Sequence, residues 1–334
     1  MTLSNAQLES VFQEAIAAAA TALTAELLRT APQMLAQQRM DQFTFEERLF
    51  EHWGKALDLF QTTLVVAREA GESFNEQQRP RAAKEQDFMF EVLTRLHARA
   101  CLTASEVGVL LRSGYADAAM SRWRTLHEIT VVASFIKQHG GETAERYLLH
   151  EIVESCKAAE QYERYRERLG FDPLTPDELP RLRAQREGLR ERFGEAFDRD
   201  YGWAAEALDG HSPNISEIEQ AVGLDHMRPY YRMASYGVHS NPKGIKFSLG
   251  LGNHPSQMIL LAGPSNAGLC DPGHATVISL TNCTVTLLTQ IPTFDALVIC
   301  QTLLELTEAT GLAFLDAHIT MEAMIAAPPQ TDNL

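Results

Sequence analysis

The chain has 334 residues, and 45% of them are hydrophobic, which is enough for one large core or for two domains of ordinary size. It carries 29 Lys and Arg against 44 Asp and Glu, a formal net charge of −15. This negative charge argues against a protein that binds nucleic acid or anionic membrane through long-range electrostatic attraction. Binding to either would need a local basic site on the surface. The five cysteines are odd in number and form no CxxC pair, which argues against a disulfide framework or a zinc ribbon and favours a reducing compartment.

The N-terminal segment is predicted to be helical. Residues 4–28 are rich in Ala, Leu, Gln and Glu, which are good helix formers. The apolar stretch 11–28 follows no basic region and is interrupted by Glu14 and Glu26. These features indicate an Ala-rich helix and not a signal peptide.

A second helical pattern begins at Thr44, where Thr44 and Glu47 have the spacing of a capping box. The polar segment 71–80 ends in proline and is the best candidate boundary in the chain. We therefore expect an N-terminal helical arm at residues 1–78 and a helical bundle domain at residues 79–325.

Three long helices are expected next, at residues 81–112, 115–138 and 143–169, separated by short glycine-containing breaks. Gly170 stands where a glycine commonly ends a helix. Loops this short make consecutive helices antiparallel neighbours, which is the geometry of a bundle.

A turn-rich connector at 171–180 leads to a charged surface helix at 181–197 and then to a helix at 229–239 with Pro229 in its first turn. Residues 245–271, rich in glycine and proline, are expected to form a small irregular or hairpin insertion. Two more helices complete the pattern, and the predicted fold class is all-α.

The segment 275–304 is the one stretch that needs weighing as a membrane span. Pro292 and Asp295 divide it into two pieces, and it contains several threonines. A buried helical hairpin fits these residues better than a transmembrane helix does. We expect a cytoplasmic protein without membrane contact.

The helix at 229–239 carries a candidate catalytic pair, Arg232 and His239. Seven steps at about 100° per residue return to within about 20° of the starting direction, so both side chains lie on one helical stripe. Tyr231, Ser235 and His239 form a second series at intervals of four residues. An arginine and a histidine at this separation also occur by chance, and the tyrosines are equally suited to packing.

The chemistry of this pair suits the cleavage of a phosphodiester. The planar guanidinium of Arg232 can hold a phosphate oxygen and the charge of a transition state. His239 lies in the last turn, where the helix dipole favours imidazolium, and it suits a general acid or base. Lys243 would add phosphate affinity. RNA supplies its own nucleophile, the 2′-OH, so we expect no metal and no other cofactor.

A second pair, Arg124 and Glu128, lies one turn apart in the helix at 115–138. If the pair is buried, each charge needs a partner of opposite charge or hydrogen bonds. Glu128 either faces Arg232 or His239 across the bundle and orients the site, or the pair is a structural ion pair that fixes helix register. The sequence leaves both interpretations open.

These residues form two motifs, R-x3-E at Arg124 and Glu128, and Y-x3-S-x3-H at Tyr231, Ser235 and His239. In them the chain resembles an all-helical bacterial family of unknown function related to the HEPN superfamily. Many members of that superfamily are ribonucleases of toxin–antitoxin and phage-defence systems.

Arg232 and His239 also match the R-x(4–6)-H motif of HEPN ribonucleases at its longest spacing. The resemblance covers about residues 80–310. It implies a HEPN-like antiparallel bundle and a homodimer in which two motifs meet in one metal-independent active site.

We therefore expect an endoribonuclease, a toxin or phage-defence effector, with Arg232 and His239 as the catalytic pair. Arg124, Glu128, Tyr231, Ser235 and Lys243 would support it, and a regulatory protein is a further candidate partner. The alternative is a non-catalytic scaffold or sensor that binds a protein or a nucleotide through the arm and residues 245–271.

Overall fold

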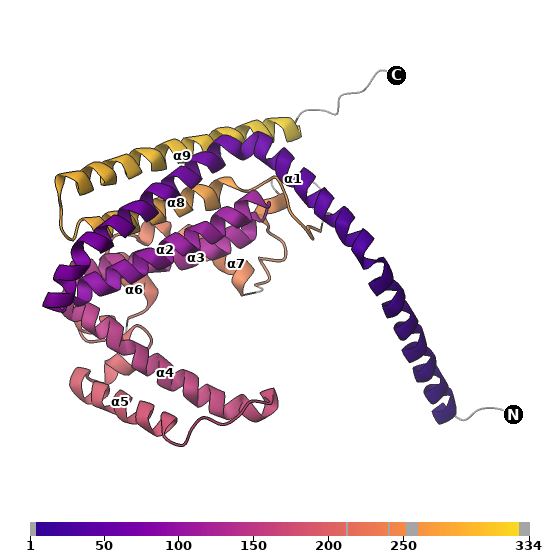
Figure 1. Cartoon of the computed structure of the whole chain (residues 1–334), viewed down its shortest axis with the longest axis horizontal. Coiled ribbons are helices and arrows are strands. Elements are labelled where there is room, and N and C mark those ends of the chain that lie inside the picture. The colour runs from indigo at the N-terminus through magenta and orange to yellow at the C-terminus, as the bar shows by residue number, and fades with distance from the viewer. Residues whose placement is uncertain (1–4, 212, 240, 252–259, 327–334) are drawn as a thin grey trace. The chain divides into compact units, whose positions relative to one another are not determined.

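The computed structural model describes residues 5–211, 213–239, 241–251 and 260–326 (Figure 1). Throughout these ranges the chain forms α-helices and short 3₁₀ segments and no strand, which confirms the predicted all-α class. Residues 245–251 and 260–271 contain one short 3₁₀ segment and the start of a helix. The described part of the predicted insertion is therefore irregular, and residues 252–259 lie outside the described residues.

The first helix is longer than the sequence predicts. Helix α1 (Asn5–Glu85) runs for 81 residues without interruption. It merges the two predicted N-terminal helices and continues through the expected break at 71–80. Phe74 is buried, and the centre of its ring lies 6.1 Å from the centre of the Phe90 ring. This apolar packing stabilises the helix through residues 71–80 although the segment is mostly polar.

Two compact units divide the chain at Met1–Glu51 and His52–Leu334. The expected boundary at residue 78 therefore lies inside the second unit. Trp53 and Phe60 are fully buried, and the indole of Trp53 donates a hydrogen bond of 3.0 Å to the carbonyl of Asn266. The residues from His52 onward thus belong to the bundle core.

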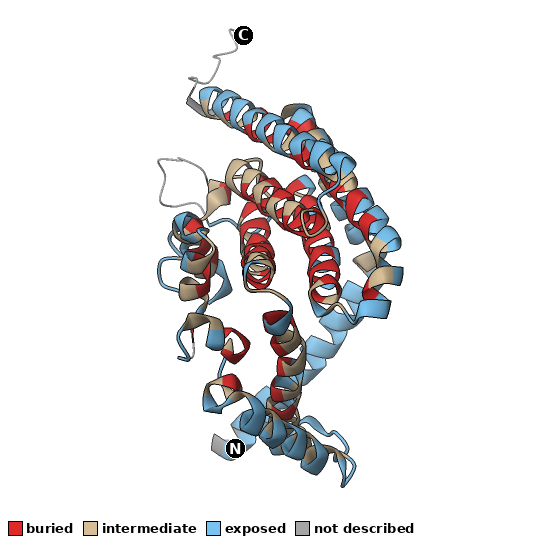
Figure 2. Cartoon of the chain, turned by 90° about the vertical axis from the view of Figure 1, so that its left-hand side faces the viewer, coloured by how far each residue is buried: buried red, intermediate tan, exposed pale blue. Residues whose placement is uncertain are grey.

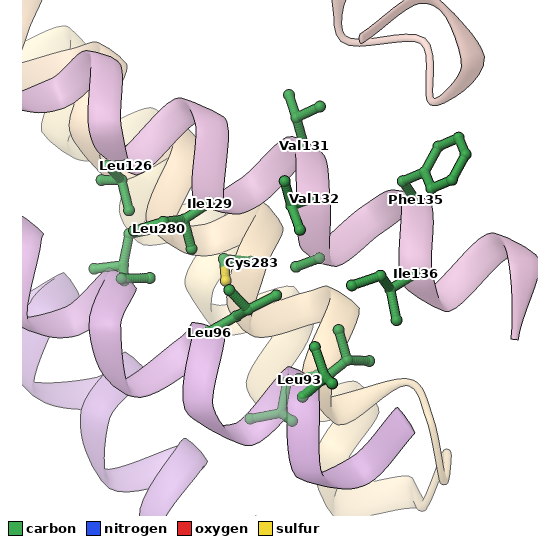
Figure 3. Close-up of a cluster of buried hydrophobic side chains, with 14 of the residues drawn as sticks. Leu93, Leu96, Leu126, Ile129, Val131, Val132, Phe135, Ile136, Leu280 and Cys283 are labelled. Atoms are coloured by element: carbon green, nitrogen blue, oxygen red, sulfur yellow. The ribbon is translucent and has the colours of Figure 1, made fainter. Parts of the chain in front are cut away.

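Helices α2 (Phe88–Arg112), α3 (Ala116–His139) and α8 (Cys270–Leu288) lie side by side at the centre of this unit. The buried residues gather where these helices face one another (Figure 2). Figure 3 shows leucine, isoleucine and cysteine side chains of the three helices meeting in one cluster: Leu93, Leu96, Leu126, Ile129, Leu280 and Cys283. Burying such side chains is the main stabilising contribution to the bundle.

Local signals account for the ends of α2. The carboxylate of Asp87 accepts a hydrogen bond of 2.9 Å from the backbone N–H of Phe90, which caps the helix. Gly114 adopts a φ of 78°, a conformation that favours glycine, and turns the chain into α3. The short connection makes α2 and α3 neighbours, as predicted.

Helix α4 (Gly141–Leu169) does not continue this arrangement. Its buried residues end at Cys156, and its second half pairs with α5 (Glu178–Phe193) in a hairpin that projects from the bundle (Figure 1). The short loop thus places α4 beside α3 only near its start. Gly170 ends α4 with a φ of 70°, as expected. Helix α5 buries no residue, which agrees with the predicted surface helix.

Short helical segments follow the α4–α5 hairpin. Helix α6 (Ile215–Ala221) begins with a capping box of Asn214 and Glu217, and α7 (Arg228–Val238) begins with Pro229 in its first turn. Helix α7 packs on α3.

Helix α9 (Phe294–Ala326) packs on α8, and the predicted division at Pro292 falls in the loop between them. Two described helices, α1 and α9, contain segments long and apolar enough to cross a membrane by length and composition. One third of the most apolar segment of α9 is buried in the bundle.

Candidate functional site

The candidate site forms where α7 crosses α3. Tyr231 and Ala234 turn inward and pack with Met120 and Trp123 of α3. Gly237 allows a close approach, because a Cβ atom there would lie 3.1 Å from the hydroxyl of Ser121. This apolar contact fixes α7 on α3 and leaves the neighbouring face of α7 for polar side chains.

Four residues of the two motifs form one connected network. Arg124 Nη1 lies 3.2 Å from His239 Nε2, and Arg124 Nε donates a hydrogen bond of 3.3 Å to Glu128 Oε1. The phenol of Tyr231 donates to the same carboxylate oxygen. The guanidinium of Arg124 also lies 4.5 Å from the centre of the Tyr231 ring. The structure therefore joins the R-x3-E and Y-x3-S-x3-H motifs directly.

A second layer of charge lies behind Tyr231. Glu219 of α6 is fully buried, and its Oε1 lies 3.1 Å from Nε2 of His127. Its other oxygen lies 3.0 Å from Nε of Arg228, whose guanidinium is 4.9 Å from the centre of the Tyr231 ring. A buried carboxylate is tolerated only with such partners, so these three residues form a unit that supports Tyr231.

The electrostatics of the network keep Tyr231 protonated. Burial raises the pKa of the Tyr231 phenol well above its ordinary value, and the negative charge of Glu128 raises it further. The pKa of nearby Tyr201 is raised by the same two causes, burial first. Tyr231 is therefore a hydrogen-bond donor near neutral pH.

The hydrogen-bonding role of His239 Nε2 follows from geometry. An arginine side chain has donors only, so in this contact His239 Nε2 accepts from Arg124 and the ring proton lies on Nδ1. The sequence suggests imidazolium here because of the helix dipole. His239 lies at the C-cap of α7, where its backbone N–H bonds to the carbonyl of Ser235.

Arg232 lies outside the network. It is exposed, and no hydrogen bond or ion pair joins it to another described residue. It belongs to a stripe of α7 formed by Arg228, Arg232, Ser235 and His239, at intervals of four, three and four residues. Arg232 and His239 thus share a helical face and are both open to solvent, although the arginine in contact with His239 is Arg124.

The remaining predicted residues have local roles. The hydroxyl of Ser235 donates a hydrogen bond of 2.8 Å to the carbonyl of Tyr231, within its own helix. Lys243 is exposed and lies over the ring of Tyr236, with Nζ 4.8 Å from the ring centre. The other side of α7, with Met233 and Tyr236, lines a mainly apolar cleft of about 520 Å³.

Sequence reasoning missed His127, Glu219 and Arg228. Arg228 has a recognisable signal, because it begins the stripe that contains Arg232 and His239. The pairing of His127 with Glu219 spans 92 residues and leaves no mark in the sequence. In the part of the chain that the structure describes, no three His, Cys, Asp or Glu side chains are grouped to hold a metal ion.

A profile of a family of unknown function, DUF5677, matches residues 90–256, half of the chain. The matched segment contains every residue of the network and of the layer behind it. Neither the curated proteins nor the solved structures include a match to this sequence. The chain belongs to the DUF5677 family, whose function is unknown.

Proposed function

We propose that the chain is a metal-independent endoribonuclease with a HEPN-like bundle and an active site on the polar stripe of α7. The observation that carries this proposal is the pairing of His239 with Arg124, with the exposed Arg232 on the same stripe of α7 as His239. An exposed imidazole with an unprotonated Nε2 can act as a general base once the Arg124 donor has left that nitrogen. Two nearby guanidiniums supply the positive charge that a phosphodiester needs.

The reaction uses the 2′-OH of the substrate as nucleophile. His239 Nε2 takes the proton of the 2′-OH, the 2′-oxygen bonds to phosphorus, and the bond from phosphorus to the 5′-oxygen breaks. The leaving 5′-oxygen takes a proton from water. The products are a 2′,3′-cyclic phosphate and a 5′-hydroxyl end.

Arginine side chains provide the electrostatic part of this mechanism. Arg232 binds a non-bridging phosphate oxygen, and Arg124 turns from His239 towards the phosphate when RNA enters. In the chain without RNA, Glu128 and Tyr231 keep Arg124 next to His239 through the carboxylate hydrogen bonds and the ring contact. RNA is bound at this local site only, since the chain carries a net charge of −15.

The experiment is an incubation of the purified protein with RNA in EDTA, with analysis of the product ends. We expect cyclic-phosphate ends from the wild type and at least about a 100-fold loss of rate for His239→Ala and for Arg232→Ala. His226→Ala and Arg168→Ala are matched controls, because both residues are exposed and lie outside the network. Absence of cleavage by the wild type, or equal cleavage by the catalytic variants, contradicts the proposal.

A second candidate function, a non-catalytic scaffold or sensor, is favoured by a different observation. Arg124, Glu128 and Tyr231 satisfy one another within the chain, which is what a structural clamp between α3 and α7 requires. Expression in cells separates the two candidates. Growth arrest that His239→Ala relieves supports the nuclease, and indifference to this change supports the scaffold.

A further inference from the structure

The cleft beside α7 has the size and the lining of a ligand pocket. Its volume is about 520 Å³, and pockets for small molecules span roughly 300–1,000 Å³. Its walls come from α7, from the first turns of α3 and from residues within 244–251 and 260–263. Three aromatic side chains belong to the lining, Tyr115, Tyr236 and Phe247. Aromatic faces in a mainly apolar cleft suit a flat aromatic ligand.

Contacts within the chain hold the walls of the cleft in place. The carboxylate of Asp117 in α3 accepts hydrogen bonds from the hydroxyl of Ser248 and, at 2.9 Å, from the backbone N–H of Leu249. Gly244 lets its segment approach α7 closely, because a Cβ atom there would lie 2.5 Å from the carbonyl oxygen of Tyr236. The cleft is therefore preformed, which lowers the entropic cost of binding a ligand.

The charge of this region points to an anionic ligand. Residues 226–270 contain no Asp or Glu, although the whole chain has 44 of them. The same stretch contains four basic residues, Arg228, Arg232, Lys243 and Lys246. Among the described residues that line the cleft, the one carboxylate is that of Asp117, and hydrogen bonds engage both of its oxygens. In a chain with a net charge of −15, this stretch is a local basic site.

Tyr236 connects the cleft with the proposed active site. It lies about 40° around α7 from Arg232 and about 60° from His239, whereas Met233 lies about 100° from Arg232 on the cleft side. Lys243 Nζ lies 3.4 Å from the phenol oxygen of Tyr236 and 4.8 Å from the centre of its ring. A phosphate held by Arg232 or Lys243 thus has the Tyr236 ring and the cleft next to it.

We propose that the cleft beside α7 binds one nucleobase of the RNA, next to the phosphate held by the polar stripe. This inference rests on the proposed ribonuclease function and names a part of the substrate that the function leaves open. The base stacks on Tyr236 and enters the apolar cleft, while the phosphates stay at the exposed guanidinium and ammonium groups. Stacking of this kind accepts every base, since every base has a π face.

Two single-stranded ligands of equal charge isolate the contribution of the base. One is a hexamer of deoxyuridine nucleotides, and the other is the same deoxyribose–phosphate chain without bases. Neither has a 2′-OH, so binding is measured apart from cleavage. Titration calorimetry in EDTA gives the two dissociation constants. We expect the wild type to bind the base-bearing hexamer at least about 10-fold more tightly than the base-free chain.

Two variants of the full chain locate the base in the cleft. Tyr236→Ala removes the stacking ring, and Ala118→Trp puts a large side chain into the cleft from an exposed position of α3. Each should weaken binding of the base-bearing hexamer about 10-fold and leave binding of the base-free chain unchanged. Tyr230→Ala and Ala158→Trp are the matched controls, because both positions are exposed and neither lines the cleft. The controls should bind both ligands as the wild type does.

Several results overturn the inference. These are equal binding of the two ligands by the wild type, no binding of either, and a loss in Tyr236→Ala that is the same for both ligands. Uridine 5′-monophosphate tests a free nucleotide as the source of the base. Binding as tight as that of the hexamer would assign the cleft to free nucleotides and overturn the assignment to RNA.

The outcome stays distinct from that of the nuclease proposal. Circular dichroism melting confirms that the variants keep the folded bundle, and cleavage of RNA is measured separately. A wild type that prefers the base-bearing hexamer without cleaving RNA contradicts the nuclease proposal alone. A wild type that cleaves RNA but binds both hexamers equally contradicts the base site alone.

Discussion

Arg124 and His239 lie 115 residues apart in the sequence, and in the structure their side-chain nitrogens are 3.2 Å apart. Since the guanidinium can only donate, the contact fixes the proton of the neutral His239 ring on Nδ1. The unprotonated Nε2 of His239 therefore faces the guanidinium of Arg124, which in the proposed reaction moves to the phosphate. This arrangement combines the base and the electrostatic group that phosphodiester cleavage needs.

The tautomer of His239 can be observed directly. In ¹⁵N–¹H correlation spectra of the neutral ring, we expect the Nδ1–H form in the wild type. Arg124→Met removes the donor, and the ring should return to the Nε2–H form that predominates in free histidine. His226, which is exposed and makes no contact with Arg124, is the internal control. Identical spectra of His239 in both proteins would show that the contact does not persist in solution.

Removal of the buried carboxylate of Glu219 should be strongly destabilising. Glu219→Ala leaves the buried His127 and the guanidinium of Arg228 without their counter-charge. Breaking such a buried pair lowers the free energy of unfolding by about 3–5 kcal/mol. Urea denaturation measures the free energy of unfolding. The control is Glu76→Ala at an exposed position, for which we expect a free energy of unfolding within about 0.5 kcal/mol of the wild type. A loss below about 1 kcal/mol for Glu219→Ala would mean that the layer behind Tyr231 is dispensable.

Two helical glycines should respond to alanine with opposite signs. A Cβ atom at Gly71 would lie 2.2 Å from Cε1 of His97, and this ring is pinned by a hydrogen bond of 3.0 Å to Thr284. Gly71→Ala should therefore lower the free energy of unfolding by about 1–3 kcal/mol through overpacking.

Gly188 lies in α5, and a Cβ atom added there would meet no other atom within 4 Å. Gly188→Ala should raise the free energy of unfolding by about 0.5–1 kcal/mol, because alanine restricts the unfolded chain. Thermal or urea unfolding of the two variants provides the comparison. Equal effects of the two substitutions would contradict the close packing of α1 on His97.

Acid should weaken the fold through His97. Burial lowers the pKa of His97 to about 4, whereas a histidine in an unfolded chain has a pKa near 6.5. Between these values the unfolded chain binds a proton that the folded chain does not bind. The contribution of His97 to stability is thus complete above pH 6.5 and falls by about 3 kcal/mol as the pH approaches 4.

His97→Gln removes this titration. The difference in free energy of unfolding between wild type and variant should therefore shrink by about that amount from pH 7 to pH 4. Urea titrations at several pH values measure it, and His226→Gln is the control for an exposed ring. A difference that stays constant with pH would show that His97 titrates alike in the folded and unfolded chain.

Local features of the fold were predictable from the sequence because they depend on neighbouring residues. Gly170 ends α4 in the left-handed conformation that glycine adopts without strain, and Pro229 begins α7 where its missing N–H costs nothing. The runs of helix-forming residues between short glycine-containing breaks likewise mark α2 and α3 as helices. The helical period of about 3.6 residues places Arg232 and His239 on one stripe.

Only the tertiary structure decided which groups meet. Helix α1 continues through 71–80 because Phe74 packs on α2, and α4 leaves the bundle because its later residues have no apolar partner there. The contacts of Arg124 with His239 and of His127 with Glu219 join residues 115 and 92 positions apart. Burial and charge compensation between distant segments select these contacts, and local sequence patterns carry no information about them.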